Sequence, residues 1–284
     1  LFKKFWARIV VTMAVIGPGI ITANADNDAG GITTYSIVGA EFGTKMLWLL
    51  ILITFSLAIT QEMGMRIGVV TRQGLAGLIR ENFGVKWTAF AMVTMLIANI
   101  GTMTAEFAGI AASFSLIGLN KYLVVPVSAL LIFMILYKGS FKSTQKIFLV
   151  FSFFYVVYII NGFVIKPDYA QALKDVVTPT LEFSVPFLVT MIALIGTTIT
   201  PWGQFFIQSY IVDKGLTTEH YKSGKKEVYF GAVLTNVVSF FIIICTATVL
   251  YKTGIKITDA GDAAMALKPI AGEAAQFLFA FGLF

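Results

Sequence analysis

The chain has 284 residues, of which 57% are hydrophobic and only 13% are charged. Because soluble globular domains carry about 25% charged residues, this composition and a mean hydropathy of +0.84 exclude an ordinary water-soluble protein. The net charge of +6 would point to nucleic acid in a soluble chain, but loop lysines of a membrane protein explain it better. We therefore expect the lipid bilayer as a partner and no nucleic acid.

Apolar stretches of the length needed to cross a hydrocarbon core of about 30 Å recur along the whole sequence. Short polar loops separate eight of them, at 7–41, 46–69, 88–117, 122–137, 146–165, 184–212, 228–251 and 263–284. The first residue is Leu1 rather than Met, and the last stretch runs to the end of the sequence. We interpret 1–284 as a single transmembrane transport domain, in a fragment with about eight of the helices.

The first stretch admits a second interpretation. Lys3, Lys4 and Arg8 precede an apolar run and the small-residue triplet 23–25, an order that resembles a cleavable signal peptide. A transmembrane helix is favoured, because the apolar pattern resumes after the polar cluster instead of opening a secreted domain.

Basic residues are distributed unevenly between the loops. If the N-terminus is cytoplasmic, fourteen of the 21 lysines and arginines lie on the cytoplasmic side. The positive-inside rule therefore favours that orientation. We expect an integral multi-pass protein of a prokaryotic plasma membrane.

The first stretch is interrupted by polar residues and glycines. Residues 24–31 read Asn-Ala-Asp-Asn-Asp-Ala-Gly-Gly, and no continuous helix is favoured through Gly30, Gly31 and four polar side chains. Unwound backbone at membrane depth occurs only where protein or a watery cavity satisfies its polar groups. Freed carbonyl groups beside the carboxylate of Asp28 would form a cation site.

The sixth stretch, 184–212, is interrupted as well. Pro201 cannot donate to the carbonyl of Thr197, four residues earlier, which is left as a free acceptor. Two interrupted segments at corresponding places in two halves are the best sequence indication of a transporter's substrate site. Residues 7–165 would then form one repeat and 184–284 an incomplete inverted copy, although each break alone is equally typical of a structural kink.

Other ionisable residues allow two interpretations. Glu106 is a lone carboxylate among small residues, and it either lines the ion pathway or carries protons, or it is a protonated packing group. Glu62 and Arg66 have the spacing of an ion pair near the end of a span. His220, the only histidine, falls in a Lys-rich loop and is expected to be a solvated surface residue.

The sequence resembles the NRAMP family of divalent metal transporters along essentially its whole length. Residues 39–43, Gly-Ala-Glu-Phe-Gly, match the family's Gly-Ser-Gln-Phe-Gly, which places its Asp-Pro-Gly-Asn on 28–31. The family's Ala-x-x-Met-Pro-His falls on 197–202, and its Asp-x-x-Glu on 103–106. Of these motif residues the sequence keeps four, which are Asp28, Gly30, Pro201 and Glu106. The other side chains of the three family motifs are replaced.

The resemblance implies an all-α, leucine-transporter-like fold of ten core helices in two inverted repeats with unwound first and sixth helices. It also implies a metal site at Asp28, with the carbonyls of Ala25 and Thr197, the hydroxyl of Thr200, and room left by Gly31. Further residues would line the ion pathway: Asp26, Asn27, Glu106, Trp202 and Gln204.

The departures from the family pattern favour hard oxygen ligands over soft sulfur ligands. Met is a soft ligand suited to thiophilic metals, whereas Thr200 offers a hard oxygen, and Mg²⁺ is bound by one or two carboxylates plus water. Among NRAMP relatives the sequence is most similar to the NRAMP-related magnesium transporters. We expect Mg²⁺ and also Mn²⁺ as transported ions, no cofactor, and no proton coupling, because Met103 and Trp202 replace titratable residues.

Two alternatives use the same sequence differently. A transporter of an organic solute such as an amino acid, coupled to Na⁺ or H⁺, would use the half-helix N-termini to bind a carboxylate, but Asp28 would repel that anion. A membrane-embedded enzyme or a structural subunit is disfavoured, because the spans contain no catalytic constellation of side chains.

Overall fold

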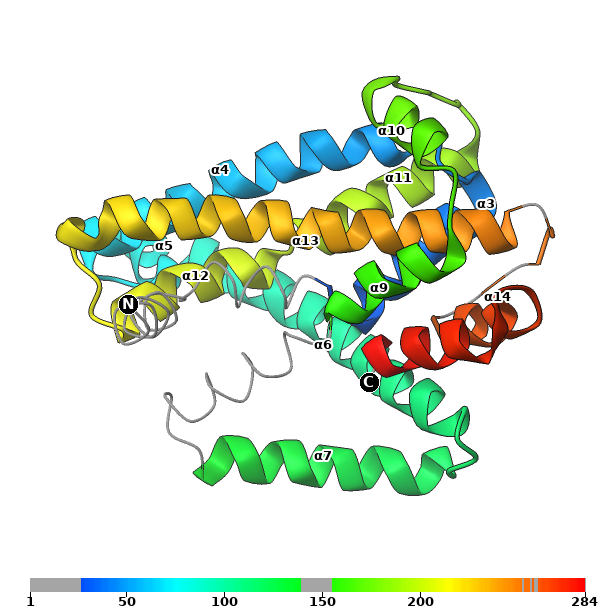
Figure 1. Ribbon diagram of the computed structural model, residues 1–284. Coiled ribbons are helices and arrows are strands. Elements are labelled where there is room, and N and C mark those ends of the chain that lie inside the picture. Colours follow the sequence, from blue (N-terminus) through cyan, green and yellow to red (C-terminus); the bar gives the residue numbers. More distant parts are fainter. Residues whose placement is uncertain (1–26, 139–154, 252, 256, 258–259, 284) are drawn as a thin grey trace, which may run out of the picture. The chain divides into compact units, whose positions relative to one another are not determined.

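The chain is described here from a computed structural model, which covers residues 27–138, 155–251, 253–255, 257 and 260–283. Within these ranges every regular element is a helix, as expected (Figure 1). In chain order the α-helices are α3 Ala29–Phe42, α4 Leu47–Thr71, α5 Leu75–Phe83, α6 Val85–Ser115, α7 Lys121–Lys138, α9 Val156–Ile165, α10 Tyr169–Val177, α11 Val185–Thr198, α12 Pro201–Asp213, α13 Tyr221–Leu250 and α14 Ala260–Leu283.

Four stretches of the described chain are long and apolar enough to cross a membrane. They are Leu47–Thr71, Val85–Ser115, Val185–Asp213 and Thr218–Leu250, and Lys121–Tyr137 and Val156–Ile165 are shorter apolar helices. Each lies on a stretch predicted from hydropathy. The exposed apolar side chains of α6 and α7 agree with a lipid surrounding, because lipid does not drive such side chains inward.

The described chain divides into two compact units. The first unit contains Thr54–Asn99 and Ile199–Thr235, and the second contains Asn27–Ile53, Ile100–Thr198 and Asn236–Phe284. Three long helices, α4, α6 and α13, each contribute residues to both units.

In the second unit, α3 packs against α11 and α14, and α14 packs against α9. The close contact of α3 with α13 depends on Gly39, because a Cβ atom there would collide with the Thr246 hydroxyl and the Ile243 carbonyl. Small residues at helix contacts allow such close approach in membranes. The rings of Tyr158 on α9 and Phe279 on α14 meet edge to face at 5.1 Å between centroids.

In the first unit, an apolar cluster joins α4, α12 and α13. Its buried members are Met65, Val69, Ile207, Ile211 and Val228. Gly64 faces Ile207 across the α4–α12 contact, where a Cβ atom would lie 2.8 Å from the Ile207 Cγ2 atom. This contact holds the middle of α12 against α4.

The predicted ion pair of the second span is confirmed. Glu62 is buried, and its carboxylate accepts a hydrogen bond of 2.6 Å from Arg66. The hydroxyl of Tyr221 also donates to Glu62. The negative charge of the Glu62 carboxylate is thus stabilised by both Arg66 and Tyr221. His220 is exposed, and the backbone N–H of Thr217 in the same turn donates to its Nδ1 at 3.2 Å.

Three features were not predicted from hydropathy. The short helices α5 and α10 lie in expected loops, and α14 is kinked at Gly272, where φ is 85°. Glycine adopts a positive φ without steric cost, and Lys268 and Glu273 form an ion pair of 3.0 Å across the kink.

Candidate metal-binding site

The helix after the first predicted break begins at Asp28. Its backbone is extended, with φ −64° and ψ 174°, and its Oδ1 accepts a hydrogen bond of 2.6 Å from the backbone N–H of Gly31. Aspartate is among the best N-cap residues because its carboxylate satisfies a first-turn N–H group. Gly30 and Gly31, which were expected in the unwound segment, therefore lie inside the first turn of α3. The backbone N–H groups of a first turn have no carbonyl acceptor within the helix.

A second carboxylate reaches the same turn from α6. The Oε1 atom of Glu106 accepts a hydrogen bond of 3.2 Å from the backbone N–H of Ala29. A Cβ atom at Gly30 would lie 3.3 Å from Asp28 Oδ1 and 3.6 Å from the Ala105 Cβ. The absence of a side chain at Gly30 thus leaves space beside both carboxylates.

The carboxylates of Asp28 and Glu106 meet at one helix turn, so hard oxygen ligands and negative charge are concentrated there. A divalent cation would offset their mutual repulsion, and oxygen ligands suit Mg²⁺ and Mn²⁺. Within the described residues, no group of three or more Asp, Glu, His or Cys side chains could hold a metal ion. A cation at Asp28 and Glu106 would therefore complete its coordination with peptide oxygens, hydroxyl groups or water.

The residues just before Asp28 are only partly described. Asn27 is fully buried, and its Oδ1 accepts a hydrogen bond of 3.1 Å from the hydroxyl of Ser239 on α13. This bond fixes the backbone immediately before the cap. Ala25 and Asp26, predicted to contribute to the metal site and pathway, lie outside the described residues.

The helix before the second break, α11, is tied to α3. The hydroxyl groups of Tyr35 on α3 and Thr198 in the last turn of α11 lie 2.9 Å apart and share a hydrogen bond. Thr198 also lies 3.2 Å from the Leu194 carbonyl, to which it can donate. Thr197 is half-buried in the same last turn, where carbonyl groups have no donor four residues later in the helix.

The helix after the second break, α12, begins at Pro201 in the first unit. Thr200 is its N-cap, is buried, and accepts a hydrogen bond of 3.3 Å at Oγ1 from the backbone N–H of Gly203. Proline is favoured at the first helical position because its missing N–H would be unpaired there in any case. The predicted interruption is thus confirmed as a separation of two helices by Ile199 and Thr200.

Two predicted pathway residues follow in the first turn of α12. Trp202 stacks edge to face on Phe206 at 6.1 Å between centroids. Its indole Nε1 is buried and has no hydrogen-bond partner among the described residues. Gln204 is half-buried.

The structure therefore brings some of the predicted residues together. Asp28, Gly31 and Glu106 meet at the first turn of α3 in the second unit. Thr200, Trp202 and Gln204 lie at the first turn of α12 in the first unit. The first turns of α3 and α12 are each capped by a side-chain oxygen, from Asp28 and Thr200, and the residues before Asn27, where the first break is predicted, lie outside the described residues.

Sequence analysis missed Tyr35 and Ser239. Ser239 is a polar residue in the apolar run of α13, which is a detectable signal for a bond between helices. Tyr35 carries no such signal, because its partner Thr198 is distant in sequence.

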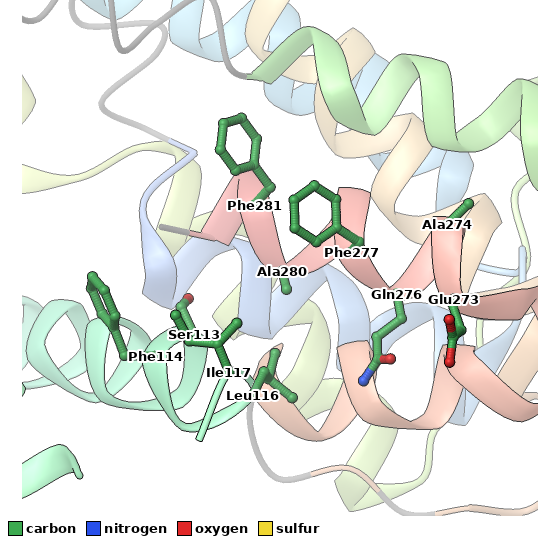
Figure 2. A pocket seen from close by; sticks show the side chains of 10 residues that line it. All are labelled: Ser113, Phe114, Leu116, Ile117, Glu273, Ala274, Gln276, Phe277, Ala280 and Phe281. Carbon is green, nitrogen blue, oxygen red and sulfur yellow. The ribbon is translucent and has the colours of Figure 1, made fainter. Parts of the chain in front are cut away.

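A separate hollow of about 670 Å³ lies between the end of α6 and α14. Figure 2 shows the phenyl rings of Phe114, Phe277 and Phe281 around it. The hydroxyl of Ser113 points to the same hollow and has no hydrogen-bond partner among the described residues. Its walls are mostly apolar, and its one carboxylate, Glu273, is paired with Lys268, so the carboxylate pair is the better candidate site for a cation.

Comparisons with known proteins give the family of the chain. The family model described as Nramp, natural resistance-associated macrophage protein-like, matches residues 19–284. The divalent metal cation transporter MntH of Erwinia tasmaniensis is 26% identical over 281 residues, and that of Klebsiella pneumoniae is 25% identical over 280 residues. Each alignment covers 96% of this chain and 68% of the relative. Both are transporters by name, in agreement with the expectation that the chain is not an enzyme.

Solved structures give the fold. A crystal structure of a manganese transporter variant from Eremococcus coleocola superposes with a TM-score of 0.74 at 20% identity, over 95% of this chain and 61% of that one. The same transporter in complex with an aromatic bis-isothiourea substituted compound superposes with a TM-score of 0.74 at 18% identity. That superposition covers 98% of this chain and 62% of the transporter chain. The expected all-α transporter fold is confirmed, and the chain spans about three fifths of the length of these solved structures.

Proposed function

The chain belongs to the natural resistance-associated macrophage protein-like (Nramp) family, and on this basis we propose that it moves divalent metal ions across a membrane, with Mg²⁺ as the main ion and Mn²⁺ also accepted. The observation that carries the proposal is the pair of carboxylates, Asp28 and Glu106, on the first turn of α3. The relatives named as divalent metal cation transporters support the ion class.

Asp28 is the charged ligand of the proposed site. Mg²⁺ prefers octahedral oxygen coordination and keeps several waters, so one or two carboxylates with peptide oxygens suffice. The resemblance to the family adds the carbonyls of Ala25 and Thr197 and the hydroxyl of Thr200 as further proposed ligands, some of them through water. Gly31 contributes its N–H to the cap rather than an oxygen to the ion.

The preference for Mg²⁺ rests on the absence of soft ligands. Thr200 places a hard hydroxyl oxygen at the start of α12, where the resemblance expects methionine sulfur. Sulfur ligands select thiophilic metals, and oxygen ligands select Mg²⁺, Ca²⁺ and Mn²⁺. This chain is therefore proposed to belong with the magnesium-transporting branch of its family.

The ion moves without a coupled proton in this proposal. Trp202 and Met103 occupy the positions where the resemblance expects titratable side chains, and neither residue titrates. Met103 is 58% exposed and presents a thioether on α6. Transport is then driven by the concentration gradient and by the membrane potential, which favours inward movement of a cation.

Alternating access is the proposed mode of transport. The chain is interrupted between α11 and α12, and α3 and α12 each begin at a side-chain cap, Asp28 and Thr200. Such discontinuous helices bind substrates and coupling ions in transporters with inverted repeats. Residues 7–165 and 184–284 correspond to the first repeat and an incomplete second one.

Purified protein in liposomes tests the ion class directly. An internal Mg²⁺ dye should report uptake that depends on external Mg²⁺, and Asp28→Ala should abolish it. Uptake of a labelled amino acid with no Mg²⁺ flux would instead support an organic solute transporter on the same fold and would overturn the proposal.

A further inference from the structure

A hollow lined by lysines lies at the beginning of α13, within the first unit. Its lining residues are Tyr221, Lys222, Lys225, Lys226 and Tyr229, and its volume is about 580 Å³. Residues 222, 225 and 226 are spaced three and four apart, so their side chains lie on one side of the helix. The hollow therefore presents three ammonium groups together.

These ammonium groups are not neutralised by ion pairs among the residues that the structure describes. Lys225 lies over the ring of Tyr229, at 5.5 Å from its centroid, a weak attraction that leaves the charge in place. Like charges three or four residues apart destabilise a helix by about 0.2–0.5 kcal/mol per pair. Cations near the positive end of a helix are also unfavourable, so an anion in the hollow would relieve both costs.

The same side of α13 continues as an exposed apolar strip. Phe230 and Val233 are 58% and 52% exposed, and they lie four and seven residues after Lys226. The stretch Thr218–Leu250, which contains both features, is apolar and long enough to span a membrane. A basic hollow followed by apolar side chains matches a ligand with an anionic head and a hydrocarbon tail.

We propose that this hollow binds the headgroup of an anionic phospholipid, with the acyl chains along Phe230 and Val233. Lys222, Lys225 and Lys226 bind the phosphate, and the hydroxyl of Tyr229 lies at the level of the headgroups. Tyrosines are enriched at that level of the bilayer, and basic pockets beside transmembrane helices bind anionic lipid headgroups. This lipid site is independent of metal transport.

Binding of short-chain phosphatidylglycerol and phosphatidylcholine to the purified chain tests the proposal, with native mass spectrometry as the readout. The chain should retain phosphatidylglycerol in preference to phosphatidylcholine. The triple variant Lys222→Gln, Lys225→Gln, Lys226→Gln should bind phosphatidylglycerol about a hundredfold more weakly, because each lysine near a lipid surface contributes on the order of 1 kcal/mol and about 1.4 kcal/mol corresponds to a tenfold change in affinity.

Matched variants separate the hollow from general surface charge and from misfolding. The triple variant Lys86→Gln, Lys121→Gln, Lys174→Gln removes three exposed lysines elsewhere and should bind as the wild type does. Substitution of Lys222, Lys225 and Lys226 by arginine keeps the charge and should restore binding. Equal affinity of the two glutamine variants, failure of arginine to restore binding, or equal retention of the two lipids would overturn the proposal.

Soluble glycerol phosphate distinguishes a lipid site from a site for a free anion. It shares the phosphate chemistry but lacks acyl chains. It should not displace phosphatidylglycerol at equal concentration. Complete displacement would contradict the lipid assignment and indicate a site for soluble phosphate esters.

Discussion

Asp28 and Glu106 bind the same turn of helix from two directions. Asp28 caps α3 from within the chain at 2.6 Å from Gly31 N, and Glu106 reaches Ala29 N at 3.2 Å from α6. The two carboxylates are 78 positions apart in sequence, yet the backbone N–H groups of one turn hold both. This arrangement fixes the position of the negative charge where the proposed ion binds.

Glu106→Gln tests the role of the second carboxylate. Glutamine retains a carbonyl oxygen that accepts from Ala29 N, but it removes the charge. We expect the apparent KM for Mg²⁺ uptake to rise about tenfold, because removing a charged partner costs roughly 1–3 kcal/mol.

The control for Glu106→Gln is Glu41→Gln, which removes an exposed carboxylate from α3, the helix whose first turn Glu106 contacts. Uptake by this variant should equal that of the wild type. An unchanged KM in Glu106→Gln would show instead that Glu106 is a packing residue.

Thr200→Met tests the preference for hard ions. Methionine adds a soft sulfur ligand, so the ratio of Mn²⁺ or Cd²⁺ uptake to Mg²⁺ uptake should rise. Thr200→Ser keeps the hydroxyl and a good N-cap, and it should preserve the wild-type ranking. If both variants rank the metals as the wild type does, Thr200 does not face the ion.

Gly39→Ala tests the close contact of α3 with α13. The added methyl group would overlap the Thr246 hydroxyl and lie 2.9 Å from Ala247 N. Overpacking of this kind costs about 1–3 kcal/mol, so the midpoint of thermal unfolding in detergent should fall.

Gly101→Ala is the matched control for Gly39→Ala. Gly101 lies in the middle of α6, and no atom lies within 4 Å of a Cβ placed there. Alanine has the higher helix propensity, so its unfolding midpoint should be unchanged or higher. Equal losses in both variants would contradict the packing derived for Gly39.

A pH dye inside the liposomes tests proton coupling during Mg²⁺ uptake. The pH inside should stay constant while Mg²⁺ accumulates, because Trp202 and Met103 carry no titratable group. Acidification that depends on the metal would contradict the proposed uncoupled transport.

The long apolar helices and the interruption at Thr200 could be predicted from the sequence, because hydropathy and proline act locally. The helices α5 and α10 were missed because each has only 9 residues, far shorter than a membrane-spanning window. α10 did carry a local signal, because its N-cap Asp168 accepts a hydrogen bond of 3.0 Å from Gln171 N. An aspartate followed three residues later by a glutamine is a sequence pattern typical of a helix N-terminus.

The candidate site was predictable only in part. Asp28 could be found as a carboxylate beside glycines in an apolar stretch, and Glu106 as a lone charge. Their meeting at Ala29 and Gly31 depends on the packing of α6 against α3, which periodicity does not encode. The bond between Tyr35 and Thr198 is likewise a tertiary contact between residues 163 positions apart.

Mg²⁺ uptake into liposomes by Asp28→Asn and Asp168→Asn tests the central proposal most directly. Both residues are aspartate N-caps that accept from a backbone N–H three residues later, and asparagine caps a helix as well as aspartate does. The two variants thus keep their helix caps and lose one charge each. We predict that Asp28→Asn loses Mg²⁺ uptake while Asp168→Asn keeps the wild-type rate; wild-type uptake by Asp28→Asn would contradict the account.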